Sequence, residues 1–252
     1  MTDLGLKTHE DLWGYRKRLR FIEAIVQDLF ASSTAGDVKI LDVGCGNGSQ
    51  LALPLLNRGF SVTGIDIDER SISKAKTLAS GILNSKFLCC KPEDLSPDSS
   101  YDVVILSEVL EHLVEPGALL QSSVDRIGRG GILIVTVPNG YGEFEWDSWI
   151  FNRLKLQFVV NALARNSQDV LGATENQECG HVQFFTQERL ERLFSDYHLT
   201  IIREEPGVFI SGPIVGHTLA RSRRFVDWNA RVTQRLPFSW ASSWYFALRP
   251  EK

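Results

Sequence analysis

Apolar positions near the start of the chain recur with a helical period. Leu19, Ile22, Val26 and Leu29 fall on one stripe, with the three- and four-residue spacing of the buried face of an amphipathic helix. The basic residues of this segment lie mostly off the stripe: Arg16, Lys17, Arg18 and Arg20. The pattern predicts a helix over 10–31 that packs on the rest of the protein through its apolar side.

From residue 38 onward, short apolar runs alternate with helical segments. Runs of strand length occupy 38–43, 61–67, 86–90, 101–106 and 131–137. Helical segments lie between them at 50–57, 68–79 and 116–127. Such alternation is typical of a parallel sheet that is covered by helices on both faces. We therefore predict an α/β, doubly wound, Rossmann-like fold.

The last third of the chain extends this sheet. A helix is predicted over 188–194, a sixth strand over 199–204 and a seventh over 243–248, which we expect to run antiparallel into a mostly parallel seven-stranded sheet. We expect one domain over 1–252, made of an N-terminal helix (1–35), a cofactor-binding core (36–140), a lid insertion (141–180) and C-terminal strands and helices (181–252).

The insertion at 141–180 is rich in aromatic and apolar residues. A connection this long usually carries function or a helix of its own. We interpret it as a helical lid; the alternatives are a lid that forms an apolar substrate pocket, or one that dips into a membrane surface. The later segment 207–240 contains five arginines and one acidic residue, with interleaved aromatic residues. It is either a solvated helix face or a contact for an anionic or membrane surface, with an RNA backbone less favoured.

Composition narrows the class of protein. With 43% hydrophobic and 23% charged residues among 252, and a formal charge of −4, the chain has the profile of an ordinary globular protein. The acidic balance does not favour a nucleic-acid partner. Without a secretion-type leader or an apolar run of spanning length, we expect a cytoplasmic protein, with peripheral membrane association left open. The four cysteines lack CxxC spacing and are expected to be buried, reduced thiols.

A glycine-rich turn follows the first predicted strand. Gly44, Gly46 and Gly48 come directly after Asp42 and Val43, and a helical pattern begins at once. Such a turn brings backbone N–H groups and a helix start to a crevice at the carboxyl ends of the strands. The spacing is G-x-G-x-G and not the G-x-G-x-x-G of dinucleotide sites.

Four segments in order resemble the motifs of class I S-adenosylmethionine-dependent methyltransferases. They are Leu-Asp-Val-Gly-Cys-Gly-Asn-Gly at 41–48, Gly-Ile-Asp-Ile-Asp at 64–68, Ser-Glu-Val-Leu-Glu-His-Leu at 107–113 and Val-Thr-Val-Pro-Asn at 135–139. The resemblance covers about 36–140 and continues faintly to 196. It implies that S-adenosylmethionine is the cofactor.

The resemblance also implies a set of donor-site residues. Asp66 would accept hydrogen bonds from the ribose hydroxyls, and Asp42 would orient the glycine loop or meet the amino group of the donor. The whole implied set is Asp42, Gly44, Cys45, Gly46, Asp66, Ile67, Pro92, Glu93 and Ser107. Lys91 departs from the pattern, because many relatives carry an acidic residue there that contacts adenine.

The segment after the fourth strand carries the candidate chemistry. Glu108, Glu111 and His112 stand at i, i+3 and i+4, so a helical turn would point all three to one side. His112, supported by Glu111, could act as a general base. Alternatively, the three could bind Mg²⁺ or another divalent metal, with His181 as the fourth ligand.

The Glu-x-x-Glu-His pattern followed by a later histidine is similar to two metal-assisted groups. These are the ubiquinone-biosynthesis O-methyltransferases and the enzymes that methylate the 2′-hydroxyl at the 3′ end of small RNAs. A Glu-His-Leu turn also occurs in metal-free relatives, so a metal-independent base stays open.

We therefore expect transfer of the methyl group of S-adenosylmethionine to a hydroxyl of a small or lipid-like acceptor. The alternatives are an RNA 3′-terminal 2′-O-methyltransferase and a non-catalytic cofactor-binding protein of the same fold. The sequence leaves the acceptor and the oligomeric state open.

Overall fold

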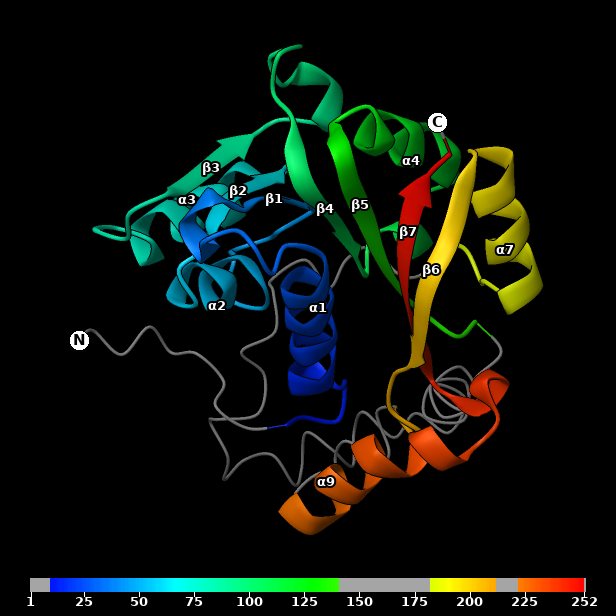
Figure 1. The fold of residues 1–252 in the computed structure, drawn as a ribbon. Helices are drawn as coiled ribbons and strands as arrows, with labels where there is room; N and C mark the ends of the chain where they lie inside the picture. The colour runs from blue at the N-terminus through cyan, green and yellow to red at the C-terminus, as the bar shows by residue number, and fades with distance from the viewer. Residues whose placement is uncertain (1–9, 141–181, 212–221, 252) are drawn as a thin grey trace.

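A computed structural model describes residues 10–140, 182–211 and 222–251 (Figure 1). Its centre is a seven-stranded sheet with the order β3-β2-β1-β4-β5-β7-β6. The strands are β1 Lys39–Val43, β2 Ser61–Asp66, β3 Ser85–Cys89, β4 Tyr101–Ser107, β5 Ile127–Pro138, β6 Leu199–Pro206 and β7 Ser243–Pro250. Only β7 runs antiparallel to its neighbours, β5 and β6. The predicted α/β fold with one antiparallel strand is confirmed.

Helices cover both faces of this sheet. The α-helices are α1 Tyr15–Leu29, α2 Ala52–Asn57, α3 Glu69–Leu78, α4 Pro116–Val124, α7 Gln187–Asp196 and α9 Arg223–Val232. Short 3₁₀ turns lie at η1 Ala35–Asp37, η2 Pro92–Asp94, η3 Leu110–His112, η6 Thr233–Arg235 and η7 Phe238–Trp240.

Two hydrophobic clusters form the core, one on each face. Neighbouring residues of a strand point to opposite faces, so Ile40 packs into the cluster with Ile22 of α1. Leu41 packs into the other cluster, with Leu120 of α4 and Leu190 of α7. Burial on both faces explains why the central strands are almost continuously apolar.

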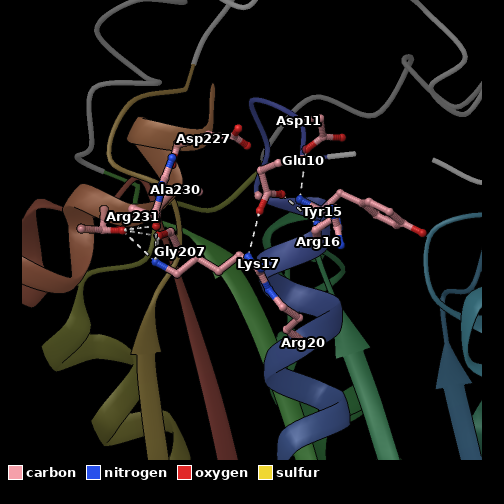
Figure 2. A network of polar contacts seen from close by, with 12 residues as sticks. Glu10, Asp11, Tyr15, Arg16, Lys17, Arg20, Gly207, Asp227, Ala230 and Arg231 are labelled. Atoms are coloured by element: carbon pink, nitrogen blue, oxygen red, sulfur yellow. Dashed lines mark hydrogen bonds and ion pairs between the residues drawn. The ribbon is translucent and has the colours of Figure 1, made fainter. Parts of the chain in front are cut away.

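The predicted helix at 10–31 begins later than expected, at Tyr15. Gly14 precedes it with φ of +71°, and a Cβ at this position would lie 2.7 Å from the Tyr245 hydroxyl. Side chains before Gly14 cap the helix, because Asp11 Oδ1 accepts from the N–H of Tyr15 at 3.0 Å and Glu10 Oε1 from that of Arg16 at 2.8 Å (Figure 2). Residues 10–14 therefore cap the N-terminal end of α1 and are not part of the helix.

Three local predictions were wrong. The helix at 116–127 ends at Val124, and Ile127 begins β5 opposite Tyr101. The helix after the glycine turn begins at Ala52 and not at 50. Cys89, on the edge strand β3, is exposed, and Cys45 and Cys90 are half-buried, although burial was predicted for all of them.

The lid insertion at 141–180 lies outside the described residues, and so does Cys179. The single-domain organisation stays a prediction. In the part of the chain that the structure describes, no helix is long and apolar enough to cross a membrane.

Candidate functional site

The carboxyl ends of β1, β2, β4 and β5 meet at one edge of the sheet, as the parallel registers require. The glycine turn follows β1 there, and the Glu-His segment follows β4. This is the edge where open α/β sheets bind their ligands.

The glycine turn is held by its neighbour strand. The backbone N–H groups of Gly44 and Cys45 both donate to Ile65 O, at 2.8 and 3.0 Å. Gly44, Gly46 and Gly48 have φ of +72°, +54° and +76°, a region that favours glycine. A Cβ at Gly44 would lie 2.6 Å from Val109 Cγ2. The glycines are therefore needed for both backbone conformation and packing.

A short turn separates the loop from α2. Asn47 Oδ1 accepts from Ser49 N at 3.1 Å and from Ser49 Oγ at 2.7 Å, an arrangement that competes with helix formation. The helix is six residues long, so the helix start that we expected beside the loop contributes only a small dipole.

Asp66 ties β2 to the glycine turn. Its Oδ2 accepts from Gly46 N at 2.8 Å and its Oδ1 from Asp68 N at 2.9 Å. Each carboxylate oxygen keeps a lone pair for a further donor. The next residue, Ile67, is 76% exposed despite its apolar side chain, which suits a flat apolar group of a ligand.

The loop after β3 lies beside Asp66, since Cys90 N donates to Asp66 O at 3.1 Å. Pro92 is buried, whereas Lys91 and Glu93 are largely exposed and lie 3.9 Å apart at their charged ends. Asp94 accepts from Lys91 N at 3.0 Å and closes the turn.

Asp42 is almost fully buried at the end of β1, 3% exposed. Burial raises its pKa to about 7; Arg18 opposes the shift, and the Asp66 carboxylate adds to it. Its carboxylate also accepts from the backbone N–H of Ala52. Cys45 lines the same region, and burial raises the pKa of its thiol.

Glu108 does not continue a helix, which corrects the expected i, i+3, i+4 turn. Its φ is +55°, an uncommon conformation for a residue with a side chain that costs on the order of 1 kcal/mol. Thr136 holds it on both sides: Glu108 N donates to Thr136 O, and Thr136 Oγ1 donates to Glu108 Oε1, each at 2.9 Å. Ser107 Oγ lies 2.9 Å from the same Thr136 hydroxyl.

Glu111 lies at the base of the Glu-His segment, 1% exposed. Burial, with Glu108 nearby, raises its pKa well above the ordinary value. Its Oε2 is buried without a hydrogen-bond partner among the described residues. Its Oε1 lies 3.8 Å from Nε2 of His112, whose side chain is about one third exposed. A buried acid therefore lies behind a more accessible imidazole.

The segment at 182–185 docks onto this Glu-His turn. The N–H groups of Val182 and Gln183 both donate to Glu111 O, at 2.9 and 3.0 Å. Among the described residues, no three His, Cys, Asp or Glu side chains are placed to hold a metal ion. His181, the fourth metal ligand expected from the sequence, directly precedes Val182 and lies outside the described residues.

Arg18 of α1 lies beside the candidate site, although the helical pattern predicted it off the buried face. Its side chain is 5% exposed, and its Nη1 lies 3.4 Å from Glu108 Oε1. Its Nη2 donates to Gln50 Oε1 at 2.9 Å. The sequence does indicate that Arg18 is buried, because Arg18 precedes Ile22 by four residues and so lies on the apolar stripe.

The comparisons with known proteins agree with this geometry. Residues 12–204 match the methyltransferase-domain family. The chain is 28% identical over 177 residues to a ubiquinone biosynthesis O-methyltransferase of Bradyrhizobium diazoefficiens, covering 70% of this chain and 63% of that protein. The corresponding protein of Rickettsia typhi is 32% identical over 133 residues, 52% of each chain. The chain thus spans less than two thirds of the length of these relatives.

Solved structures support the fold. The magnesium protoporphyrin IX methyltransferase of Synechocystis PCC 6803 with bound SAH has a TM-score of 0.52 and 17% identity, covering 92% of this chain and 83% of that one. An S-adenosylmethionine-dependent methyltransferase of Clostridium acetobutylicum has a TM-score of 0.59 and 12% identity, covering 94% and 92%. Because the family match runs over most of the chain, this protein belongs to the methyltransferase-domain family.

Proposed function

We propose that the protein transfers the methyl group of S-adenosylmethionine to a hydroxyl of a small or lipid-like acceptor. One observation carries the proposal: the glycine turn anchored by Asp66 and the Glu111–His112 pair open onto the same edge of the sheet. A donor site and a proton acceptor would then share one crevice.

The residues at this edge fit the donor. Asp66 has lone pairs available for two ribose hydroxyls, and Ile67 offers an apolar surface to the adenine ring. Arg18 is a buried cation whose Nε has no hydrogen-bond partner among the described residues, so it is suited to the carboxylate of the donor. Asp42 would meet the amino group.

The chemistry needs positioning and one proton transfer. The bound donor supplies a methyl group on a positively charged sulfur. The acceptor oxygen forms a bond to the methyl carbon, the carbon–sulfur bond breaks, and its electron pair stays on sulfur. His112 takes the proton of the acceptor hydroxyl. Glu111 lies beside that imidazole and, in its ionised form, would stabilise the positive charge of the imidazole.

The names of the relatives in Bradyrhizobium and Rickettsia favour an acceptor of the ubiquinone-precursor kind, a phenol with an apolar tail. Such an acceptor would reside in a membrane. The exposed face of α9 is compatible with that source, because Arg224, Trp228 and Arg231 follow one another at i, i+4 and i+7. Trp228 is 46% exposed.

An acceptor panel tests the function. Purified protein with S-adenosylmethionine should produce S-adenosylhomocysteine with a catechol that carries a prenyl tail, and His112→Ala should lower the rate by about 10²-fold or more. Tight binding of S-adenosylhomocysteine with no turnover on phenols, small polar alcohols or RNA would favour the non-catalytic alternative. Turnover on RNA 3′ ends alone would favour the RNA enzyme.

A further inference from the structure

Helix α1 carries two successive buried cations, Lys17 and Arg18, which are 5% and 4% exposed. Successive residues of a helix point about 100° apart, so the two side chains reach different neighbours. Arg18 reaches Gln50 and Glu108 at the candidate site. Lys17 reaches the C-terminal part of the chain.

The Lys17 ammonium is fully engaged by three acceptors. Its Nζ donates to Gly207 O at 2.6 Å, to Thr233 Oγ1 at 2.7 Å and to Ala230 O at 3.0 Å (Figure 2). Gly207 follows β6, Ala230 belongs to α9, and Thr233 begins η6. A single side chain therefore joins α1 to three C-terminal positions that are 190 to 216 residues away along the chain.

Burying the Lys17 ammonium costs desolvation free energy that an apolar side chain of similar size would avoid. The three acceptors are neutral, and burial lowers the pKa of Lys17 to about 8, with Glu205 and Glu10 opposing that shift and Arg20 adding to it. A methionine would occupy a similar volume without a buried charge. The ammonium adds orientation. Its three hydrogen bonds are directional, so they fix both the rotation of α1 about its axis and its position along that axis.

We propose that Lys17 is a positioning residue for the donor site, which holds α1 so that Arg18 faces the amino-acid end of the methyl donor. The helix backbone is stiff, and the two Cα atoms are about 3.8 Å apart. Fixing one side chain of this turn therefore fixes the direction of the next. The inference rests on the proposed function, because it assigns Arg18 to the donor carboxylate.

The test compares two ligands on one variant. Lys17→Met should bind S-adenosylhomocysteine about tenfold more weakly or worse, as measured by calorimetry. It should bind 5′-methylthioadenosine, which lacks the amino-acid carboxylate, as the unaltered protein does. The melting temperature should change little, because the buried charge and its three hydrogen bonds are removed together. Unchanged affinity for S-adenosylhomocysteine, or equal weakening of both ligands, would overturn the proposal.

A double-mutant cycle separates positioning from a direct contact. If Lys17 acts through Arg18, Lys17→Met should weaken S-adenosylhomocysteine binding no further in an Arg18→Met background. Fully additive losses would contradict the proposal. Should Lys17→Met fail to fold, Thr233→Val removes one acceptor from the opposite side and should give the same ligand selectivity to a smaller extent; equal effects on both ligands would again overturn it.

The same measurements distinguish a failure of the proposed function from a failure of the role proposed for Lys17. If the unaltered protein binds neither ligand, the donor assignment is wrong. If it binds both and Lys17→Met changes nothing, only the role of Lys17 is wrong.

Discussion

Asp66 and Asp68 lie at the end of β2 and accept hydrogen bonds from different parts of the chain. Asp66 accepts hydrogen bonds from the N–H groups of Gly46 and Asp68, beside the glycine turn. Asp68 caps α3 by accepting from Arg70 N and Ser71 N. The Ser71 hydroxyl, together with these backbone N–H groups, holds the pKa of Asp68 below the ordinary value. The pair offers a matched comparison of a proposed ligand-binding aspartate and a helix-capping aspartate.

Asp66→Ala should weaken S-adenosylhomocysteine binding by roughly 10- to 100-fold, because a hydrogen bond to a charged group contributes about 1.5–3 kcal/mol. Asp68→Ala should keep the affinity and lower stability by about 1 kcal/mol through loss of the cap. Calorimetry and thermal unfolding measure the two effects. Equal affinity of the unaltered protein and Asp66→Ala would contradict the ribose assignment.

Residue identity was predictable where one local motif sets the role. The positions of the glycine turn, Asp66, Glu111 and His112 follow from strand ends and short motifs, while their roles stay predictions. Arg18 and Lys17 did not, because both stand in a basic run that normally marks a solvated helix face. Their burial depends on partners such as Glu108 and Thr233 that are far away in the sequence.

Helix α9 is held in place by contacts with residues outside the helix. Val226, Asn229 and Ala230 are buried, and Asn229 bonds both backbone groups of Ile210, at 2.8 and 2.7 Å. The outer face keeps Trp228 half exposed, with its ring 5.7 Å from that of Phe225. The helix lies beyond the ends of β6 and β7 (Figure 1), where Pro206 pairs with Trp244.

We expect this face to bind anionic vesicles, measured by co-sedimentation with phosphatidylglycerol. Replacing both Arg224 and Arg231 with Gln should weaken binding by roughly 30-fold, because each basic residue near such a surface contributes about 1 kcal/mol. Trp228→Ala should weaken it on neutral vesicles as well.

The control for the vesicle experiment is Arg192→Gln on α7. Arg192 is exposed and pairs with Glu188, so its replacement should leave vesicle binding unchanged. Equal loss in Arg192→Gln and the α9 variant would indicate a general charge effect and remove the assignment to α9.

The elements themselves were mostly predictable, and their ends were not. The strands follow from apolar runs, and α3 and α7 begin where Asp68 and Thr186 cap them. Helix α4 ends early, and Ile127 pairs with Tyr101 in the sheet. The start of α2 and the turn at Glu108 differ from the prediction, because hydrogen bonds of Asn47 and Thr136 decide them. Such hydrogen bonds leave no periodic pattern in the sequence from which an element's end could be predicted.

At the scale of the molecule, the Glu-His turn is covered by a separate part of the chain. The segment at 182–183 bonds to Glu111 O, and Gln183 Nε2 donates to Leu113 O at 2.6 Å. Position 181 therefore adjoins a segment that docks on the Glu-His turn. A divalent metal held with the help of His181 stays a prediction.

If a metal assists the reaction, exhaustive chelation should abolish methyl transfer, Mg²⁺ should restore it, and His181→Ala should prevent that restoration. His198→Asn is the matched control, since His198 is exposed before β6 and its φ of +53° suits asparagine. Activity that survives both chelation and His181→Ala would remove the metal hypothesis and leave His112 as an unassisted base.

The sequence alone determined the class of fold, the strand ends that border the crevice, and the donor motif. Strand and helix periodicity and a glycine turn are local signals, and the carboxyl ends of parallel strands must share an edge. Only the tertiary structure decided that α1 brings Arg18 to that edge, that Lys17 ties it to α9, and that Glu111 is buried behind His112. These features are contacts between distant segments, whose burial and pKa depend on neighbours that no local pattern specifies.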